Sequence, residues 1–574
     1  MMDSITYDSA QFMKTLLEKY DKIRGLCPSK HDFAFWDVVA ISAADEEQAK
    51  SFELQISKKR ELLRIPAVQY HVFPDISGTK MGSGGSTLHI LESLEARYSS
   101  SLFEMKILLI HAGGQSRRLP SHSVLGKLFS LLPVLASAVV DMLDLKLALY
   151  LPFLTKMKPG IFLTCSDDIE TYALFDWDKA GIKNIFEAEG FTALAHPSTI
   201  DVGTTHGVYV LPPDVQATES CTVTSCLEVL QKPSVELMQS KGAVVKVQRK
   251  DSADEEFVYT DSAFFFGTKV MRTMLQYYKA AKPISTEIDA YKDFLEKLGS
   301  RSHVPTDKWS AGDVLTPIQD ALAQFPLQVL VIPKSRFYHI GTMSEYIDNF
   351  TTNQQFVTEL GLSKFTNSTF VDNNGVNKTG LQCLTNVEGV IMHSKIHPNS
   401  TIGATVVIEH CKFLVPIHVE QNCILSNCEV TSAPGEELCI PDHSIFFTAS
   451  VRSSHLSGFV TVSFGIGDDL KCTSKSSKDV SYFGASLYEL ESLEVMPMRG
   501  LFENSSSDFS LWDAKLFEVK ETMTDAFHST LNLTRAITNR EKTTVSFNQR
   551  ISMKDVLNWK CVEKVLAYQD EIFI

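Results

Sequence analysis

Residues 107–127 read ILLIHAGGQSRRLPSHSVLGK, and this stretch decides the fold class. Its first four residues are a continuous aliphatic run, which predicts a buried strand of a parallel sheet. Residue types that suit phosphate follow the strand: the glycine pair Gly113-Gly114 and the cations Arg117, Arg118 and Lys127. Glycines let backbone N–H groups approach phosphate oxygens closely, and the cations would neutralise their charge. The stretch predicts a nucleotide-phosphate loop, and the alternative is a tight turn with surface arginines.

The flanking sequence predicts an α/β domain with a mostly parallel sheet. Apolar runs at 36–41 and 160–164 are strand-like, and residues 8–26, 88–98 and 135–150 have helical patterns. A second glycine-rich turn, at residues 82–87, precedes the helical pattern at 88–98. In such sheets ligands bind beyond the carboxyl ends of the strands, where both the 107–127 loop and Asp167 are expected.

A different periodicity begins near residue 380. Aliphatic residues recur every six positions: Leu384, Val390, Ile396, Ile402, Ile408 and Leu414. This hexapeptide repeat predicts short parallel strands stacked as a β-helix, and the alternative is chance in an apolar region. The register breaks beyond Glu420, although Ile424 and Val430 could resume it.

Bulk composition narrows the class of protein. The chain has 574 residues and a formal net charge of −15, which disfavours nucleic-acid and anionic-membrane partners. We expect no membrane span, because the longest apolar stretch falls far short of the roughly 20 residues that a membrane helix needs. The eleven cysteines are scattered without a C-x-x-C pair, so reduced thiols and a cytoplasmic location are expected.

The loop resembles the signature of the sugar-nucleotidyltransferase superfamily, approximately L-x-x-G-G-x-G-T-R-L-x-P followed by P-K. Arg118 and Lys127 take the places of the signature arginine and lysine, whereas Ser116-Arg117 replaces Gly-Thr and Gly126 replaces the proline. More closely, the chain resembles the fucose-1-phosphate guanylyltransferase family. Six segments carry this closer match: FWDVV at 35–39, GSGGST at 82–87, IHAGGQSRRLP at 110–120, THGV at 205–208, LQKPS at 230–234 and FYHIGT at 337–342.

The resemblance implies a fold, an activity and a cofactor. The fold would be a Rossmann-like nucleotidyltransferase (GT-A-like) domain at 1–350. The hexapeptide repeat itself places the β-helix at 375–475, and because a solenoid exposes its ends, we expect a capping module at 476–574. The activity would join GMP from GTP to β-L-fucose 1-phosphate with Mg²⁺ as cofactor. The implied catalytic residues are Arg118, Lys127 and Asp167.

Two aspartates resemble metal-binding positions of the superfamily. Asp167 stands at the end of a central strand; alternatively Asp168 is the ligand and Asp167 caps the next helix. Asp261, ahead of the Phe264-Phe265-Phe266 run, resembles the second metal position but could equally be a turn residue.

Further residues are assigned to the substrates by the same resemblance. Lys232 would contact the sugar phosphate, or is a surface lysine, and Glu287 and Asp289 would bind sugar hydroxyls, or are helix-start acids. The residues assigned to the nucleotide are Gly82, Gly84, Gly85, Gly113, Gly114, Arg117, His206 and Gly207. Which of the two glycine-rich loops holds the triphosphate is left open, as is a structural role for His206.

The residues themselves do not specify guanine or fucose, so another nucleotide or sugar 1-phosphate is an alternative. A non-catalytic scaffold with the same fold is a second alternative, which the presence of Arg118, Lys127 and Asp167 disfavours. The sequence does not predict an oligomeric state.

Overall fold

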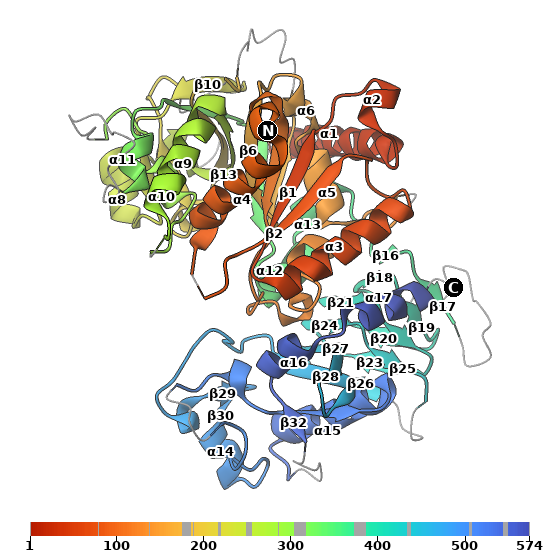
Figure 1. Ribbon diagram of the computed structural model, residues 1–574. Coiled ribbons are helices and arrows are strands. Elements are labelled where there is room, and N and C mark those ends of the chain that lie inside the picture. The colour runs from red at the N-terminus through yellow and green to blue at the C-terminus, as the bar shows by residue number, and fades with distance from the viewer. Residues whose placement is uncertain are drawn as a thin grey trace. The chain divides into compact units, whose positions relative to one another are not determined.

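The computed structural model divides the chain into two compact units (Figure 1). The first consists of Met1–Gly114 and Met142–His339, and the second of Gln115–Asp141 and Ile340–Ile574. The segment 115–141, predicted as part of the first domain, therefore groups with the second unit. The structure describes residues 2–78, 80–136, 138–174, 185–187, 189–215, 220–247, 255–284, 286–302, 317–371, 386–432, 438–503, 508–542 and 549–572.

The first unit contains a large mixed sheet with the strand order β10-β14-β8-β13-β6-β3-β1-β2. Strands β2, β1, β3 and β6 pair in parallel, and β13 runs antiparallel to both β6 and β8. The α/β arrangement predicted from the sequence is confirmed, and four adjacent strands are parallel, but the sheet as a whole is mixed rather than mostly parallel, because β13 and β10 pair antiparallel with their neighbours. The strands are β1 (Val38–Ala43), β2 (Gln69–Pro74), β3 (Lys106–His111), β6 (Gly160–Cys165), β8 (Phe191–Ser198), β10 (Thr222–Ser225), β13 (Glu255–Gly267) and β14 (Leu327–Val331).

Shorter strands extend this sheet near the candidate site. Strand β9 (Gly207–Val210) pairs with β11 (Glu228–Gln231) and with β13, and β12 (Val245–Val247) pairs with β13. Strand β7 (Asp168–Tyr172) pairs with β15 (Ser335–His339) in a separate two-stranded sheet.

Apolar helices cover the faces of the large sheet. Helices α4 (Gly82–Tyr98) and α9 (Thr268–Ala281) lie side by side, and both contribute to one core cluster with alternate residues of β1, β3 and β6 (Figure 1). Phe162 of β6 points to the opposite face, where its ring lies 4.7 Å from that of Tyr150, which follows α5 (Met142–Leu149). Helix α5 in turn packs on α1 (Met2–Ile23). The other helices of this unit are α2 (Pro28–His31), α3 (Glu46–Glu61), α6 (Leu151–Leu154), α7 (Ile200–Gly203), α8 (Val235–Lys241), α10 (Lys292–Leu295) and α11 (Ile318–Leu322).

Two helix predictions in the first unit need correction. The glycine-rich segment at 82–87 is the start of α4 itself rather than a turn that precedes the helix. The helix predicted at 135–150 begins only at Met142, because Val140–Asp141 forms strand β5, paired with β4 (Leu131–Leu132).

Three ladders of short parallel strands make up much of the second unit. One ladder runs β16-β18-β21-β24-β27, the second β17-β19-β22-β25 and the third β20-β23-β26. The strands are β16 (Phe365–Thr366), β17 (Thr369–Phe370), β18 (Val390–Met392), β19 (Lys395–Ile396), β20 (Thr401–Ile402), β21 (Val406–Glu409), β22 (Lys412–Phe413), β23 (Ile417–Val419), β24 (Cys423–Ser426), β25 (Glu429–Val430), β26 (Leu438–Ile440) and β27 (Ser444–Arg452).

The ladder register explains where the six-residue pattern drifts. Ile396 pairs with Phe413, and Val390 pairs with Val407, so each of these strands aligns with the strand 17 positions later. Three steps of six would need 18 positions, and the inward residue of β22 is consequently the buried Phe413, whereas Leu414 is only half-buried. Leu384, the first residue of the predicted repeat, lies outside the described residues.

The C-terminal part of the second unit packs against these ladders. Strand β27 forms a long hairpin with β28 (Ser457–Gly465), followed by β31 (Phe517–Lys520) and β32 (Arg550–Ile551). Phe527 and Leu531 of α15 (Met523–Asn539) belong to the same apolar cluster as the ladder interior. The other helices are α12 (Met343–Thr351), α13 (Gln354–Leu360), α14 (Leu487–Ser492), α16 (Met553–Trp559) and α17 (Val562–Glu571).

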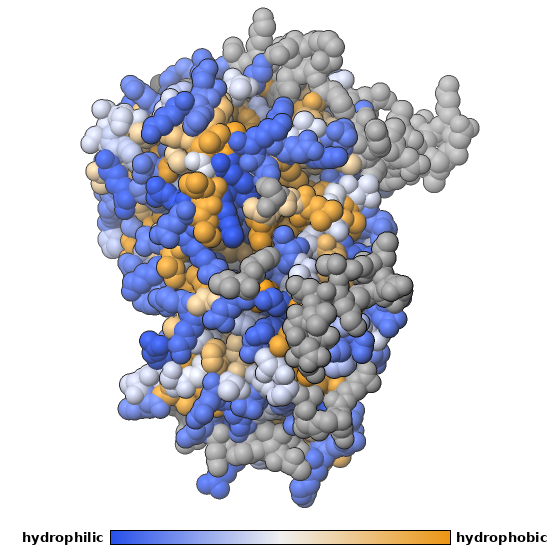
Figure 2. Space-filling model, turned by 90° about the vertical axis from the view of Figure 1, so that its right-hand side faces the viewer, coloured by the Kyte–Doolittle hydropathy of each residue, from blue (hydrophilic) through white to orange (hydrophobic). Residues whose placement is uncertain are grey.

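In the described ranges no helix combines the length and apolar character needed to cross a membrane. On the face drawn in Figure 2, hydrophobic residues form patches that hydrophilic residues interrupt.

Candidate functional site

The loop that follows β3 begins in a network of hydrogen bonds with buried polar groups. Thr87 Oγ1 donates to the Ser83 carbonyl (2.8 Å) and therefore accepts from Nε2 of His111 (2.9 Å). With the proton on Nε2, Nδ1 of His111 accepts from the Ser42 hydroxyl (3.2 Å). Burial lowers the pKa of His111 to about 4, so the ring is neutral at pH 7. The hydrogen-bond network thus selects one tautomer.

Ser42 connects this hydrogen-bond network to the backbone of the loop. Its oxygen accepts the amides of Ala112 (3.1 Å) and Gly113 (3.4 Å). A Cβ on Gly113 would lie only 3.0 Å from the backbone nitrogen of Ala44, so glycine is required for this close approach. Gly114 has φ +137° and is exposed, a conformation that also favours glycine. The two glycines fix the path of the loop as it leaves the sheet.

The second glycine-rich segment has a different role from the predicted one. The amides of Gly84 (2.8 Å) and Gly85 (3.4 Å) donate to the carbonyl of Ile288, so this helix start already has its acceptor. A Cβ on Gly82 would lie 2.4 Å from the same carbonyl oxygen, and a Cβ on Gly84 would lie 2.5 Å from the Ile288 side chain. The glycines permit close packing of the 287–290 segment, and the amides of Gly84 and Gly85 are not available to phosphate.

The two acidic residues of the 287–290 segment, Glu287 and Asp289, both interact with neighbouring residues. Asp289 Oδ1 accepts the amides of Tyr291 and Lys292 (both 2.9 Å) at the start of α10, as the helix-start alternative predicted. Glu287 forms an exposed ion pair with Lys80 (2.6 Å). The structure therefore joins two features that the sequence separates by some 200 positions, and it gives Asp289 a local structural role.

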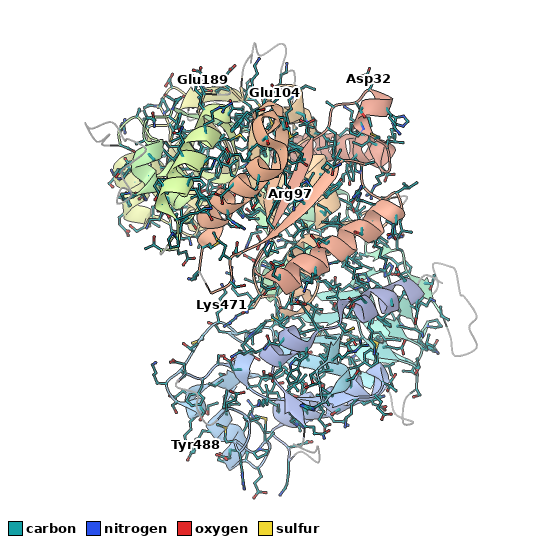
Figure 3. All side chains as sticks on the ribbon, viewed as in Figure 1. Asp32, Arg97, Glu104, Glu189, Lys471 and Tyr488 are labelled. Carbon is teal, nitrogen blue, oxygen red and sulfur yellow. The ribbon has the colours of Figure 1, made fainter. Side chains whose placement is uncertain are left out.

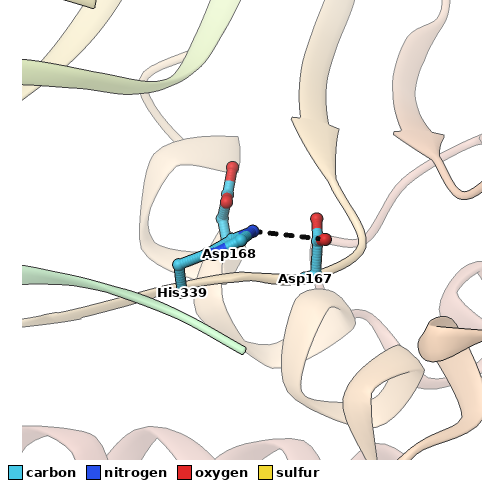
Figure 4. A group of neighbouring side chains, drawn as sticks. All are labelled: Asp167, Asp168 and His339. Atoms are coloured by element: carbon cyan, nitrogen blue, oxygen red, sulfur yellow. Dashed lines mark ion pairs between the residues drawn. The ribbon is translucent and has the colours of Figure 1, made fainter. Parts of the chain in front are cut away.

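Asp167, Asp168 and His339 lie together where β6 ends (Figure 4). One potential ligand atom from each falls within 4.8 Å of the others, and His339 Nε2 is 3.3 Å from Asp167 Oδ2. Antiparallel pairing of β7 with β15 sets Asp168 opposite His339. Burial, together with the neighbouring Asp167 carboxylate, raises the pKa of Asp168 to about 7. This concentration of negative charge would favour a bound cation.

A buried ionic network next to this group was not predicted from the sequence. Lys146 is fully buried, with its Nζ 3.4 Å from Glu170 Oε2 and 3.1 Å from both Thr164 Oγ1 and Tyr150 OH. Although burial opposes ionisation, the Lys146 charge holds the pKa of Glu170 below its ordinary value. Glu170 lies on β7 two residues after Asp168, so the network fixes the strand that carries the acidic group.

Asp261 is not in the group of potential metal ligands found among the described residues. Its Oδ1 accepts the Gly207 amide (3.0 Å), and a Cβ on Gly207 would lie 2.1 Å from its other oxygen. Burial raises the pKa of Asp261 to about 7. The structure thus shows Asp261 as a hydrogen-bond acceptor for the backbone of β9, and the Gly207 amide is already hydrogen-bonded.

Lys232 and His206 are brought together by the pairing of β9 with β11. The Lys232 amide donates to the His206 carbonyl (3.1 Å), and Lys232 has φ +47° with an exposed side chain. Strained backbone at a non-glycine residue is typical of functional sites. The His206 ring lies 4.9 Å from that of Phe337 and 6.3 Å from that of His339, so His206 borders the acidic group.

The cations of the signature loop all lie in the second unit. Lys127 Nζ donates to the Gly341 carbonyl (3.1 Å), and the Arg118 carbonyl accepts the Met343 amide (2.9 Å). The Arg117 guanidinium lies 5.2 Å from the ring centroid of Trp512. Backbone contacts with Gly341 and Met343, in and directly after the FYHIGT segment, therefore position two of the three cations, and the Trp512 ring lies beside the third.

His339 is the group member that sequence reasoning missed. It lies in the FYHIGT motif, which carried the family resemblance but was not assigned a role. Its proximity to Asp167 depends on the pairing of β7 with β15, strands more than 160 positions apart. The sequence feature that could have identified His339 as a site residue was its place inside a motif that the family shares.

Comparison with known proteins places the chain in a family. Residues 99–522 match the model of the fucose pyrophosphorylase domain. Fucose-1-phosphate guanylyltransferase of Mus musculus is 35% identical, with 97% of this chain and 96% of the relative aligned. The Homo sapiens fucose-1-phosphate guanylyltransferase is 34% identical, with 97% and 93% aligned. A crystal structure of UDP-glucose pyrophosphorylase complexed with UDP-glucose matches with a TM-score of 0.25 at 9% identity, covering 54% of this chain and 78% of that one. With a domain match over most of its length and relatives aligned nearly end to end, the chain belongs to the fucose-1-phosphate guanylyltransferase family.

Proposed function

We propose that the chain transfers GMP from GTP to β-L-fucose 1-phosphate, forming GDP-L-fucose and pyrophosphate. The observation that carries the proposal is alignment over 97% of the chain with two fucose-1-phosphate guanylyltransferases. The group of Asp167, Asp168 and His339 at the carboxyl end of β6 supports it, because ligands of α/β sheets bind at such ends.

The reaction is an in-line displacement at phosphorus. A phosphate oxygen of fucose 1-phosphate attacks the α-phosphorus of GTP, and the bond from the α-phosphorus to the oxygen bridging to the β-phosphate breaks. The attacking oxygen is already anionic, so the reaction needs no general base from the protein. Alignment of the two phosphates and neutralisation of charge supply the catalysis.

Asp167 and Asp168 would hold the Mg²⁺ that this chemistry uses. Carboxylate oxygens are the ligands that Mg²⁺ prefers, and its usual sites offer one or two carboxylates together with substrate phosphates. The donor set therefore fits the ion, and the 3.3 Å contact with His339 restrains Asp167. When bound at these residues, Mg²⁺ would supply positive charge that offsets the charge of the substrate phosphates.

The remaining roles belong to the cations. Lys232 would hold the phosphate of the sugar, consistent with its exposed side chain and strained backbone. Arg118 and Lys127 would stabilise the charge that accumulates on pyrophosphate as it leaves, and Arg117 would assist them. His206, beside Phe337, would approach the base or the sugar.

We also infer three broader features of the protein. The first unit would have the Rossmann-like, GT-A-like nucleotidyltransferase fold, and the four adjacent parallel strands β2, β1, β3 and β6 of its mixed sheet support this. The three parallel ladders would form the faces of a parallel β-helix, because a register of 17 residues returns the chain to the same ladder. The cysteines in the described part of the chain form no disulfide, and this favours a cytoplasmic location.

Lys127→Ala tests the proposed function against the scaffold alternative. We expect this variant to lose most of its GDP-fucose formation. Its affinity for fucose 1-phosphate, measured by calorimetric titration, should change little. Near-normal turnover in this variant would exclude a role for Lys127 in stabilising the leaving pyrophosphate.

A further inference from the structure

One carboxylate of the parallel ladders is buried beside the signature loop. Glu409, the last residue of β21, is 2% exposed, whereas charged side chains are usually exposed, as Lys471 is (Figure 3). Its partners in the ladder register are Met392 and Ser426, so the carboxylate is not a repeated feature of that ladder. Burying a charge is costly unless it is paired and hydrogen-bonded, and the groups that contact Glu409 therefore indicate its role.

The first of these groups is His122, which belongs to the signature loop. His122 Nε2 is 3.5 Å from Glu409 Oε1, and the ring is buried. In the sequence His122 lies between Arg118 and Lys127, the two cations assigned to the leaving pyrophosphate. The His122 carbonyl accepts the amide of Gly126 (2.9 Å), which directly precedes Lys127. The contact with Glu409 therefore anchors the middle of the segment that carries both cations.

The second group is Tyr346, on the helix that contacts the same loop. Tyr346 OH donates to Glu409 Oε2 (2.9 Å), and the rings of Tyr346 and His122 lie 5.1 Å apart, so the three side chains form a closed group. Tyr346 lies in the first half of α12, which packs on β21. The first residue of α12, Met343, donates its amide to the Arg118 carbonyl (2.9 Å). Glu409 thus holds both the loop and the helix start to which the loop is bonded.

The charge of Glu409 strengthens both contacts. Although burial opposes ionisation, His122 holds the pKa of Glu409 at about 2, so the side chain is a carboxylate at pH 7. Hydrogen bonds to an ionised acceptor are stronger than those to a neutral one. A neutral side chain at this position would therefore hold His122 and Tyr346 less firmly.

We propose that Glu409 is a positioning residue for nucleotidyl transfer: through its two partners it fixes the part of the signature loop that carries Arg118 and Lys127. The inference rests on the proposed function for the reaction that these cations serve. It gives the parallel ladders a part in catalysis, because a displacement of catalytic groups by about 1 Å can lower a rate on the order of 10²-fold.

A double-mutant cycle on the full-length protein tests this role. Glu409→Gln keeps the volume of the side chain but removes its charge, and it should lower kcat about tenfold or more with little change in the KM for fucose 1-phosphate. In the Lys127→Ala background the same substitution should cost at most about threefold, because one of the residues that Glu409 positions is already gone. Wild-type turnover in Glu409→Gln, or equal losses in the two backgrounds, would overturn the proposal.

Two further variants separate positioning from folding. Tyr346→Phe removes only the hydroxyl donor and should lower kcat about fivefold, the loss typical of one hydrogen bond, so it tests the proposal even if Glu409→Gln fails to fold. Glu429→Gln is the matched control, because Glu429 lies in another ladder and pairs with Lys412 (3.1 Å). It should change kcat less than about twofold, and a loss equal to that in Glu409→Gln would overturn the specific role of Glu409.

Hydrogen exchange separates this inference from the proposed function, because it requires no turnover. The Gly126 amide should exchange at least about threefold faster in Glu409→Gln than in the wild type, and at the wild-type rate in Glu429→Gln. This difference would support the anchoring of the loop even if GDP-fucose formation failed. Unchanged exchange in Glu409→Gln would overturn the inference even in a protein that makes GDP-fucose.

Discussion

Replacing Asp261 with asparagine separates two roles that this residue could have. In the structure its Oδ1 accepts the Gly207 amide at 3.0 Å, and the side chain is 5% exposed. An asparagine carbonyl can accept the same hydrogen bond in nearly the same volume, but it is a much weaker ligand for Mg²⁺ than a carboxylate. Asp261→Asn should therefore keep most of the activity if the role is structural, and should lose it if Asp261 holds metal.

The magnitude follows from the pKa of Asp261, which burial raises from 3.8 to about 7. Because the folded state binds the proton more tightly than the unfolded chain, stability falls as the pH rises from about 4 to about 7. Three pH units at 1.36 kcal/mol each give a cost of up to about 4 kcal/mol above pH 7. Asp261→Asn removes this titration, so the variant should gain stability relative to wild type across that range.

Thermal unfolding followed at pH 5 and pH 8 measures this difference. We expect the difference between the unfolding temperatures of Asp261→Asn and wild type to be more positive at pH 8 than at pH 5. The Mg²⁺ dependence of turnover should be unchanged. Asp261→Ala is the control: it leaves the buried Gly207 amide without its acceptor, at a cost of about 1–3 kcal/mol. Loss of turnover in Asp261→Asn together with a higher Mg²⁺ requirement would refute the structural role.

Three further changes follow from the site. Lys127→Ala should lower turnover on the order of 10²–10³-fold because it removes charge stabilisation from the leaving group, and steady-state kinetics should show little change in the KM for sugar phosphate. Asp167→Asn should weaken Mn²⁺ binding, read by electron paramagnetic resonance, by at least about tenfold; unchanged binding would exclude Asp167 as a ligand. Thr87→Val leaves Nε2 of His111 without an acceptor and should destabilise the protein by about 1–3 kcal/mol, which denaturant unfolding would detect; a neutral effect would contradict the tautomer assignment.

Local sequence patterns were enough to place the central strands. Strands β1, β3 and β6 coincide closely with predicted apolar runs, because strands buried on both faces of a parallel sheet are continuously hydrophobic. Asp167 was expected at a strand end and is found there, two residues after the last residue of β6. These features could be predicted because each depends on the hydrophobic pattern of one short stretch of sequence.

Partners that are distant in the sequence could not be predicted in this way. The role of Gly84 depends on the Ile288 carbonyl, and that of Asp167 on the ring of His339. Lys146 lies on a largely apolar helix and has no partner nearby in the sequence that would mark it, yet it is fully buried against Glu170. In each case the missing information was a tertiary contact rather than a local propensity.

The six-residue pattern anticipated parallel ladders but not their register. A period of six accounts for Ile396 and Ile402, which are both buried. It fails at Leu414 because Ile396 pairs with Phe413, 17 positions later, which is one position fewer than three hexapeptides. A connection between two strands that is one residue shorter changes the spacing of the inward residues from 18 to 17 positions. The inward residues stay apolar, so the sequence alone does not reveal the change in spacing.

Incubation of the purified chain with GTP, β-L-fucose 1-phosphate and Mg²⁺ tests the central claim most directly. Chromatography and a pyrophosphate assay should detect GDP-fucose and pyrophosphate in equal amounts, with neither product when the sugar phosphate or Mg²⁺ is omitted. Absence of both products from a folded protein that contains Arg118, Lys127 and Asp167, or pyrophosphate release without the sugar phosphate, would contradict the account.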